Sequence, residues 1–297
     1  MRVRPATADD AAEIATLCNA IGQELYGVDD VDATTVQSWL ADPRTGAFVA
    51  EAGGRLFVYA DVRRNADGTR FPIDVRARGD GSADELVAVT EQWSREQARP
   101  GAFARGEALD RDAEANAAFE SRGYRPVRHN FVMQIELEDE PEPPSWPEGI
   151  SVRTFDPERD EQRVYECQQE TFSDHDDFRP VPIEEWRRFG TEQPRFDASL
   201  WQLAEDGHEL AGLSLGSWHN SGDPTFGWIG ALGVRRPWRR RGLGLALLQQ
   251  SFADFFTRGA HRVGLGVDAQ NPTGAVMLYE KAGMCVLKRH VVHEKAL

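Results

Sequence analysis

The chain has 297 residues, which is enough for two domains that each bury a core. Lys and Arg total 34 against 49 Asp and Glu, so the formal net charge is −15 at pH 7. This balance argues against a general nucleic-acid binder or a protein of anionic membranes, because phosphate-binding surfaces need net positive charge. Only three cysteines are present, far apart and without a CxxC pair, which excludes a disulfide scaffold and a cysteine-based zinc site.

Apolar runs in the sequence stay well short of the roughly 18 residues that a membrane-spanning helix requires. The N-terminus leads directly into polar sequence, so we expect no signal peptide. These features predict a cytoplasmic protein with a small-molecule partner and without nucleic-acid or membrane partners. We expect the chain to be a monomer or a homodimer.

A proline-rich acidic segment divides the chain into two near-equal halves. Residues 138–149 contain prolines at four positions and carboxylates at five, which oppose helix and strand formation and favour an extended linker. We therefore predict an N-terminal domain over residues 1–138, a linker over 139–149 and a C-terminal domain over 150–297.

The two halves resemble each other in sequence. The matching segments are Val3-Arg4 with Val152-Arg153, Cys18 with Cys167, Ala50–Leu56 with Ala204–Leu210, and Ala118–Tyr124 with Leu278–Met284. Because the matches occur in the same order in both halves, they predict the duplication of one domain.

Each half is predicted to run strand, helix, two hairpin strands, a longer strand, helix, strand, helix, strand. In the second half, apolar residues at spacings of three and four predict an amphipathic helix over 245–256 that is stopped by Gly259. A strand over 262–267 follows, and Asn271-Pro272 is predicted to begin a helix that Gly283 ends. The predicted fold class is α/β, with a mixed sheet flanked by helices.

The segment Leu232–Gly244 carries the strongest chemical signal in the sequence. An apolar strand leads into an R-x-x-G-x-G turn, and the predicted helix follows at once. Gly242 and Gly244 let the backbone approach a ligand, and the free N–H groups of the first helical turn form a cradle for an anion such as a pyrophosphate. The alternative is a solvated basic loop. A Rossmann fingerprint would need a third glycine and a later acidic residue, and a Walker A loop would need Gly-Lys-Ser/Thr.

At this segment the sequence resembles the GCN5-related N-acetyltransferase (GNAT) superfamily, whose R/Q-x-x-G-x-G/A turn holds the pyrophosphate of coenzyme A. Residues 271–284 are similar to the next motif of that superfamily. The resemblance implies two tandem GNAT-like acyl-CoA N-acyltransferase domains and acetyl-CoA as co-substrate. The coenzyme A-binding residues that it implies are Leu232, Val234, Arg239, Arg240, Arg241, Gly242, Leu243, Gly244, Asn271 and Tyr279.

The resemblance also implies a mechanism. Backbone N–H groups of the strand that ends near Val234 would polarise the thioester carbonyl, Asn271 would lie near the pantetheine, and Tyr279 would protonate the departing thiolate. A phenol suits this role because its ordinary pKa of about 10 is close to that of a thiol. The alternative for Tyr279 is a structural tyrosine buried against the sheet. No cysteine falls in either motif, so we expect direct attack of the amine on the thioester.

The first half departs from this pattern at its functional positions. Phe119 aligns with Tyr279, so the acid is missing. In place of the arginine and glycine turn the first half has residues 79–85, whose carboxylates would repel a polyphosphate. We therefore predict that the N-terminal domain is a degenerate copy and that the C-terminal domain is catalytic.

The general base and the acceptor site are less sharply indicated. The strand before the pyrophosphate turn lacks the glutamate that family members often carry. His175 has a suitable pKa range for a base, and Asp174 and Asp176 beside it are suited to hold a cationic amine. Asp268, at a strand end, is another candidate for the substrate site. A solvated acidic loop is an equal interpretation of residues 173–178.

Two other motifs do not carry a function. Gly212–Gly216 matches G-x-S-x-G, but a turn follows the serine where a nucleophile elbow requires a helix. His290 and His293 fall on opposite faces of a predicted strand, so no metal site is predicted.

The acceptor remains open at this stage. We expect an acetyl-CoA-dependent N-acetyltransferase that acts on the amine of a small molecule. A tandem chain with one competent coenzyme A site is also similar to the mycothiol synthases, which acetylate an amino-sugar cysteine conjugate. A non-catalytic acyl-CoA-binding module is the alternative from another class.

Overall fold

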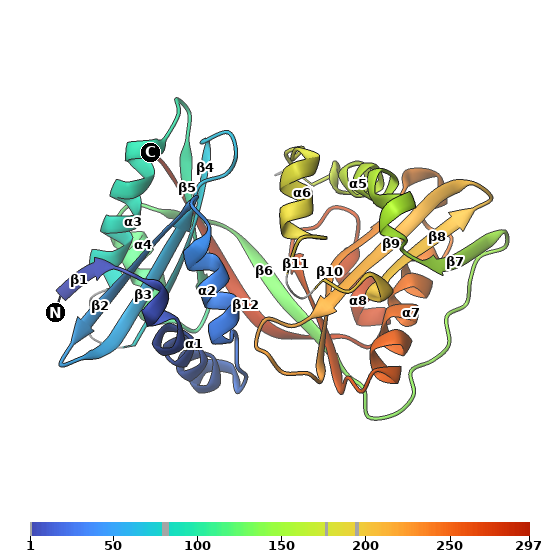
Figure 1. The fold of residues 1–297 in the computed structure, drawn as a ribbon, viewed down its shortest axis with the longest axis horizontal. Helices are drawn as coiled ribbons and strands as arrows, with labels where there is room; N and C mark the ends of the chain where they lie inside the picture. Colours follow the sequence, from blue (N-terminus) through green and yellow to red (C-terminus); the bar gives the residue numbers. More distant parts are fainter. Residues whose placement is uncertain (1, 79–82, 176–177, 194–195) are drawn as a thin grey trace. The chain divides into compact units, whose positions relative to one another are not determined.

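The computed structural model describes residues 2–78, 83–175, 178–193 and 196–297 (Figure 1). The chain forms two compact units. Unit 1 comprises residues 1–131, 220–222 and 288–297, and unit 2 comprises residues 132–219 and 223–287. In both units helices flank a mixed sheet, so the predicted α/β fold class is confirmed.

The first half of the chain supplies β1 (Arg2–Pro5), a 3-10 turn (Ala8–Asp10), α1 (Ala11–Tyr26), α2 (Ala33–Ala41), β2 (Thr45–Ala52), β3 (Arg55–Arg63), β4 (Arg70–Ala77), α3 (Ala83–Gln97), β5 (Phe103–Leu109), α4 (Ala113–Ser121) and β6 (Arg125–Glu136). The second half supplies β7 (Ile150–Thr154), α5 (Pro157–Phe172), α6 (Ile183–Phe189), a 3-10 turn (Ala198–Leu200), β8 (Trp201–Asp206), β9 (Glu209–Trp218), β10 (Phe226–Val234), a 3-10 turn (Arg236–Trp238), α7 (Leu243–Thr257), β11 (Arg262–Asp268), α8 (Ala275–Lys281) and β12 (Cys285–Ala296).

The strand order is β1-β2-β3-β4-β5-β12 in unit 1 and β6-β11-β10-β9-β8-β7 in unit 2. In each unit the hairpin strands pair antiparallel, and one pair is parallel: β4 with β5, and β10 with β11. In unit 1, α1 and α2 pack through one apolar cluster that includes Tyr59 and Leu109, and α3 and α4 pack through another that includes Phe71 and Phe119. The carboxyl ends of the parallel strands are where α/β sheets ordinarily bind ligands.

The last strand of the chain belongs to unit 1. Strand β12 (red in Figure 1) pairs antiparallel with β5, from His290 opposite Leu109 to Ala296 opposite Phe103. Strand β6 in turn passes from unit 1 to unit 2 after Phe131. The predicted domain bounds at residues 138 and 150 place β12 in the C-terminal domain and all of β6 in the N-terminal one, so they do not include this exchange of strands between the units. The division into a degenerate and a catalytic domain stays a prediction. Residues 137–149 form neither helix nor strand.

Two details differ from the predicted elements. Each half has a second helix before its hairpin, α2 and α6, which the apolar spacing did not indicate. Helix α8 begins at Ala275 rather than at Asn271, because the Asn271 side chain accepts a hydrogen bond from the Thr273 N–H at 2.9 Å and Gly274 adopts a left-handed φ of 78°. Asn271 therefore forms a turn ahead of the helix.

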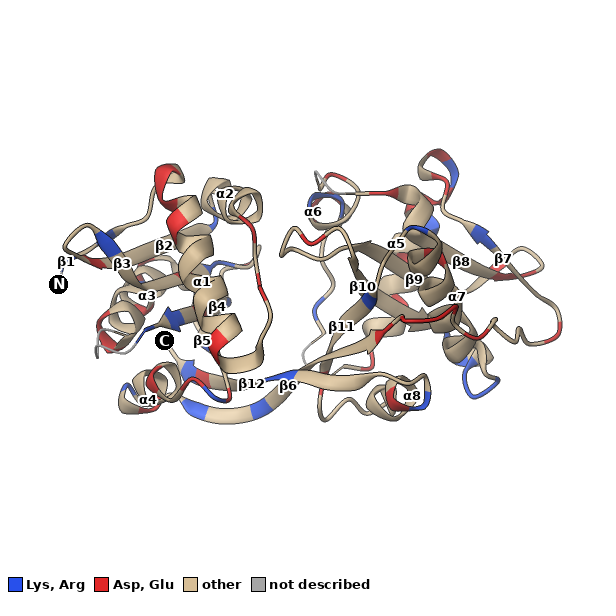
Figure 2. Cartoon of the chain, turned by 90° about the horizontal axis from the view of Figure 1, so that it is seen from below, with Lys and Arg blue, Asp and Glu red and all other residues tan. Residues whose placement is uncertain are grey.

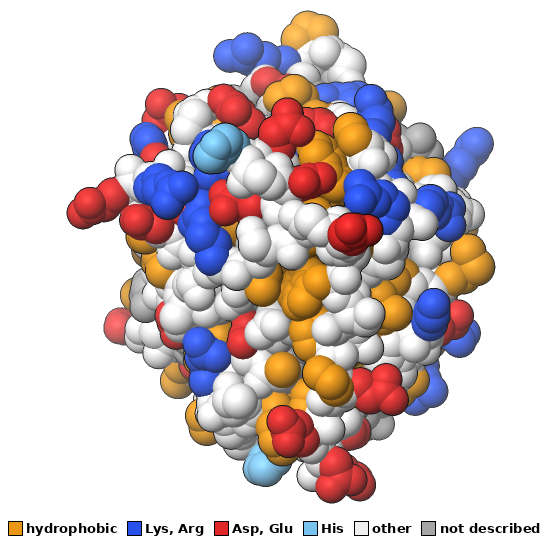
Figure 3. Space-filling view, turned by 90° about the vertical axis from the view of Figure 1, so that its right-hand side faces the viewer, with side chains coloured by type: hydrophobic (Ala, Val, Ile, Leu, Met, Phe, Trp, Pro, Cys, Tyr) orange, Lys and Arg blue, Asp and Glu red, His pale blue; other side chains and the backbone are white. Residues whose placement is uncertain are grey.

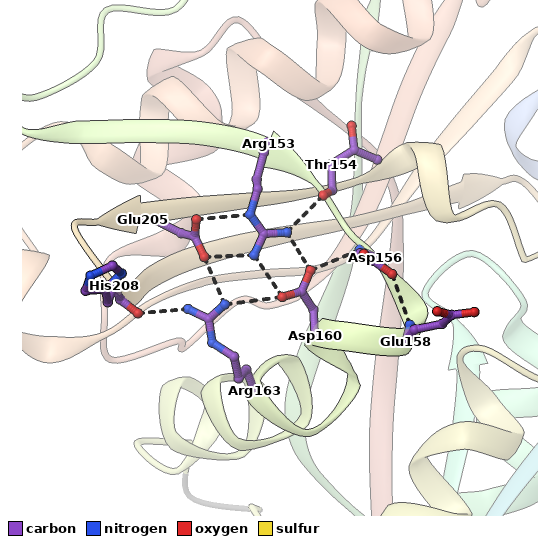
Figure 4. A network of polar contacts seen from close by, with 8 residues as sticks. All are labelled: Arg153, Thr154, Asp156, Glu158, Asp160, Arg163, Glu205 and His208. Carbon is purple, nitrogen blue, oxygen red and sulfur yellow. Dashed lines mark hydrogen bonds and ion pairs between the residues drawn. The ribbon is translucent and has the colours of Figure 1, made fainter.

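A buried ion network joins the first strand, helix and hairpin of unit 2 (Figure 4). The Arg153 guanidinium donates to Glu205 at 3.0 Å through Nε and to Asp160 at 2.8 Å through Nη2. Arg163 donates to the same two carboxylates and to the backbone carbonyl of His208. The Asp160 side chain is fully buried, and the hydrogen bond from Arg153 is the main cause that lowers its pKa to about 2.

Unit 1 repeats the arginine, aspartate and glutamate contacts of this network. Arg4 donates to Asp10 at 2.8 Å and to Glu51 at 3.0 Å, and one of its N–H groups reaches the next carbonyl in the chain at 3.2 Å. Arg153 makes the corresponding contact to the Thr154 carbonyl, also at 3.2 Å. In both units an arginine of the first strand thus joins a glutamate of the first hairpin strand to an aspartate at the start of the first helical segment, Asp10 in the 3-10 turn before α1 and Asp160 in the first turn of α5. This correspondence is expected of a duplicated domain.

Charged side chains are distributed over both units. Acidic residues lie on helices of each unit (Figure 2). On the side at which β7 lies in Figure 1, acidic and basic side chains are interspersed around apolar ones (Figure 3). Within the described ranges, none of the helices is both long and apolar enough to cross a membrane.

Candidate active site

The predicted R-x-x-G-x-G turn lies between β10 and α7 in unit 2. Gly242 adopts a left-handed φ of 87°, and Arg240 is the described non-glycine residue with positive φ, at 61°. These residues turn the chain into α7, whose first turn has no side-chain cap. Ala246 donates to the Gly242 carbonyl at 3.1 Å, so the amides before it have no acceptor within the helix. This geometry suits an anion cradle.

The glycines fit a backbone that must approach a ligand. A Cβ on Gly242 would enter open space, and Arg240 and Arg241 are exposed beside it. A Cβ on Gly244 would lie 3.2 Å from Leu278 Cδ2, so this residue closes the turn against α8. Leu243 is buried beneath the turn and anchors it to the core.

Strands β10 and β11 separate next to this turn. Their parallel pairing ends at Ile229 opposite Leu265, although β10 continues to Val234. The register against β9 shifts at Gly230, which marks a β-bulge and bends β10 away from its neighbour. The segment of β10 with the predicted residues Leu232 and Val234 therefore lies beyond the part of the strand that pairs with β11. Peptide N–H groups on that side of the segment are not used by β11, as the predicted contact with a substrate carbonyl requires.

Arg239 is fixed at the mouth of the turn. Its Nε donates to the Val234 carbonyl at 2.8 Å, and its Nη1 donates to the Asp174 carboxylate at 2.5 Å. Arg236 also pairs with Asp174. Hydrogen bonds from Arg236 and then Arg239 lower the pKa of Asp174 to about 2. Asp174 was predicted to hold the substrate; in the structure its carboxylate binds Arg239 of the predicted cradle and the preceding Arg236.

His175 and Asn271 meet next to this pair. The Asn271 Nδ2 lies 3.1 Å from the His175 Nε2, and the imidazole also packs against the Phe172 ring with centroids 5.1 Å apart. The structure therefore brings the predicted base beside the residue predicted to lie near the pantetheine. Asp176, the second predicted substrate carboxylate, lies outside the described residues.

Tyr279 lies on α8 and is almost fully buried. Burial raises its pKa to about 12. In the described parts of the chain its hydroxyl makes no hydrogen bond, so its proton is not committed to another group. A neutral, uncommitted phenol fits the predicted acid, and the burial also fits the structural alternative.

Asp268 ends β11 and organises the following turn. Its carboxylate accepts from the Gln270 N–H at 2.8 Å, and its carbonyl accepts from the Asn271 N–H at 3.0 Å. It thereby positions Asn271. Its role at a substrate stays a prediction.

The corresponding place in unit 1 is filled. Phe119 is fully buried over Gly106, where an added Cβ would lie 2.2 Å from the phenylalanine ring. The ring also stacks on His293 at 5.4 Å. Helix α3 carries Asp84 and Glu85 in its first turn, which disfavours an anion there. Residues 79–82 of the predicted acidic turn lie outside the described residues.

Sequence reasoning missed the contacts made by the loop after α5. Asp174 and Arg239 are 65 positions apart, and Asn271 and His175 are 96 apart. No local pattern encodes such pairs, although the run of opposite charges at the two segments was a partial signal. The bulge at Gly230 was also missed; a glycine inside an apolar strand was the available clue.

Comparisons with known proteins agree with this geometry. The profile of the acetyltransferase (GNAT) family matches residues 161–284. A mycothiol acetyltransferase of Actinosynnema mirum is 30% identical over 95% of both chains, and one of Salinispora arenicola is 30% identical over 97% of this chain and 94% of its own. The crystal structure of a GCN5-related N-acetyltransferase from Sphaerobacter thermophilus has 35% identity and a TM-score of 0.84, covering 99% of this chain and 95% of the other.

A tandem GNAT protein from the clavulanic acid biosynthesis pathway shares the fold, with a TM-score of 0.75 at 17% identity over 99% of this chain and 98% of its own. The chain therefore belongs to the GNAT family of acetyltransferases. It is an N-acetyltransferase with tandem architecture, from a family that uses acetyl-CoA. The predicted family, fold class and enzyme class are confirmed.

Proposed function

We propose that unit 2 alone carries out acetyl transfer, from acetyl-CoA to the amine of a small molecule. The single observation that supports this most is the open, glycine-lined first turn of α7 beside the separated ends of β10 and β11. Unit 1 has acidic residues at the start of α3 and a buried phenylalanine in place of the acid. We accordingly assign residues 1–138 to a degenerate domain, 139–149 to the linker and 150–297 to the catalytic domain.

The residues of the turn have distinct parts in this proposal. Amides at 242–244 and the guanidiniums of Arg239, Arg240 and Arg241 hold the pyrophosphate, because helix N-termini and arginine favour anions. Backbone N–H groups at Leu232 and Val234 polarise the acyl carbonyl. Asn271 contacts the pantetheine. Bound acetyl-CoA supplies the acyl group as an activated thioester.

The amine attacks the acyl carbon directly in this account. A C–N bond forms, the C–S bond breaks, and Tyr279 donates its proton to the leaving sulfur. The cysteines support a route without an acyl-enzyme. Cys18 and Cys167 are buried, and burial raises the pKa of both thiols to about 12. Cys285 is exposed at the start of β12 and falls outside both predicted motifs.

The amine must lose a proton before or during the attack. Strand β10 contributes no carboxylate for this purpose. His175 is the candidate base, supported by its contact with Asn271. Asp268, at the end of β11, remains a candidate for the substrate site.

The acceptor has two candidates. A general small-molecule amine is the broader one. An amino-sugar cysteine conjugate is the second, supported by the near full-length similarity to proteins named mycothiol acetyltransferase. A non-catalytic acyl-CoA-binding module is the alternative to both.

The test is release of free thiol from acetyl-CoA in the presence of a panel of primary amines, with mass spectrometry of the products. We expect an acetylated product from at least one amine, and no thiol release in Gly244→Glu. Binding of acetyl-CoA without acetylation of any amine, the amino-sugar conjugate included, would favour the non-catalytic module.

A further inference from the structure

Helices α5 and α7 cover opposite faces of the sheet of unit 2. In β9 an added Cβ on Gly212 would lie 3.1 Å from Leu247 of α7, whereas the next residue, Leu213, packs in one apolar cluster with Val164 of α5. The proposed coenzyme A turn opens α7, and α8, which carries Tyr279, packs on α7. The donor groups therefore belong to the α7 face. A second substrate reaches the separated ends of β10 and β11 from the α5 face without crossing them.

Trp228 lies on the α5 face. An added Cβ on Gly227 would lie 2.5 Å from the Phe255 ring of α7, and successive strand residues point to opposite faces. Opposite Trp228 in β11 is Gly264, where a Cβ would lie 3.0 Å from the indole Cζ3. A Cβ on Gly266 would lie 3.9 Å from the indole Cζ2. The indole thus extends across β11 over two positions that have no side chain.

The surface around this indole is uncovered. Strands β10 and β11 each have a neighbour on both sides in the sheet, yet Gly230 and Gly266 are exposed and Trp228 is partly exposed. In the part of the chain that the structure describes, a Cβ on Gly266 would meet only the indole within 4 Å, its chain neighbours aside. Glycines inside a strand mark bulges and places where a ligand comes close to the backbone.

The indole is held on one side and faces the proposed reaction site on the other. The rings of His219 and Phe226 pack against it, with centroids 5.2 and 6.4 Å away. In the other direction Asp268 follows Gly266 on the same face, because side chains alternate along β11. The pairing of β10 with β11 ends at the residue after Trp228. A fixed aromatic surface therefore adjoins the point at which the two strands separate.

We propose that Trp228 forms the wall of the acceptor site and selects amines that are carried on a ring. This inference rests on the proposed function, since it names the acceptor side of that same reaction. A flat indole pairs best with a partner that presents a flat or ring face. A flexible chain loses more rotamer freedom when it is bound than a ring does. With the ring on Trp228, the amine extends towards the opening beside Leu232 and Val234.

The test compares initial rates of acetyl transfer to (aminomethyl)cyclohexane and to heptylamine, which have the same number of carbons and differ in the ring. Trp228→Leu removes the flat wall and keeps an apolar side chain. Gly266→Ala adds a methyl group to exposed space and leaves the indole in place, because the 3.9 Å contact is an ordinary one. Trp39→Leu, at a partly exposed tryptophan of α2 in unit 1, is the matched control.

Wild type and Trp39→Leu should have a kcat/KM about fivefold or more higher for the ring amine than for the chain amine. Trp228→Leu should reduce this preference to about twofold or less by raising the KM of the ring amine, with the KM of acetyl-CoA unchanged. Gly266→Ala should raise the KM of the ring amine as well. Equal use of the two amines by wild type, or an unchanged preference in Trp228→Leu, would overturn the proposal.

Calorimetric titration of both amines into the full chain, with and without coenzyme A, separates this proposal from the proposed function. If wild type acetylates neither amine, binding of the ring amine that is lost in Trp228→Leu would support the acceptor wall and count against acetyl transfer alone. Absence of turnover together with absence of ring-amine binding would overturn the assignment of Trp228.

Discussion

The Asp174 carboxylate lies 2.5 Å from Nη1 of Arg239, the first arginine of the R-x-x-G-x-G turn. Arg236 holds the other carboxylate oxygen. Asp174 thus forms an ion pair with the Arg239 guanidinium, which we propose binds the pyrophosphate of coenzyme A. The loop after α5 and the coenzyme A turn are therefore coupled electrostatically.

This contact predicts that Asp174 competes with the donor. In Asp174→Asn, acetyl-CoA should bind roughly two- to fivefold more tightly, which is the range of a partly exposed ion pair. Calorimetry at low and high salt measures the effect, which should shrink as salt rises. Glu170→Gln, which removes the ion pair to Arg235, is the control. Weaker binding in Asp174→Asn would instead mean that Asp174 orients Arg239.

Tyr279→Phe should lower kcat by about 10²- to 10⁴-fold, the usual contribution of a general acid. The dissociation constant for acetyl-CoA should change less than about twofold, because the phenol is needed only when the sulfur leaves. Tyr165→Phe is the matched control, since that hydroxyl binds the Val181 carbonyl away from the turn. Unchanged kcat in Tyr279→Phe would leave Tyr279 with a structural role.

The pH profile carries a related expectation. Burial raises the pKa of Tyr279 to about 12, so the phenol stays protonated through the neutral and mildly alkaline range. At every pH below 10, therefore, loss of this proton should not reduce kcat. A fall in kcat near pH 8 that disappears in Tyr279→Phe would contradict the assignment.

Asp160→Ala should lower the free energy of unfolding by about 1.5–3 kcal/mol, because it removes charged hydrogen bonds from Arg153 and Arg163, which remain paired with Glu205. The pKa of Asp160 is lowered in the folded chain, from 3.8 to about 2. Its stabilising contribution is therefore present above pH 4 and is lost as the pH falls towards 2. Urea unfolding at pH 7 and pH 2.5 should show a smaller difference between wild type and variant at the lower pH.

Removal of residues 288–297 should destabilise unit 1. It strips β12 from the edge of β5 and leaves the buried Glu91 without its Lys295 partner. Limited proteolysis should then cut within residues 1–131 first, while acetyl-CoA binding in unit 2 is retained. Lys295→Met tests the ion pair alone, and equal protease resistance of the truncated and full chains would contradict the exchange of strands.

Local patterns predicted the parts of this molecule that depend on local chemistry. The spacing of Leu245, Leu248, Phe252 and Phe255 predicted α7, and the prolines after residue 140 predicted a segment without helix or strand. The exchange of β12 into unit 1 was not predictable, because pairing between His290 and Leu109 depends on contacts distant in sequence. The contact between Asp174 and Arg239 was not predictable for the same reason. The start of α8 was misplaced because Asn271 folds its side chain onto Thr273 instead of capping a helix.

The most direct test is titration of acetyl-CoA into wild type and Gly244→Glu by calorimetry, with thermal unfolding to confirm that the variant is folded. The account predicts one site per chain in wild type and none in Gly244→Glu, because the added side chain fills the turn against α8. Two sites per chain would show that unit 1 also binds the donor. Unchanged binding in the variant would place the coenzyme A site elsewhere, and absence of binding to wild type would contradict the central claim.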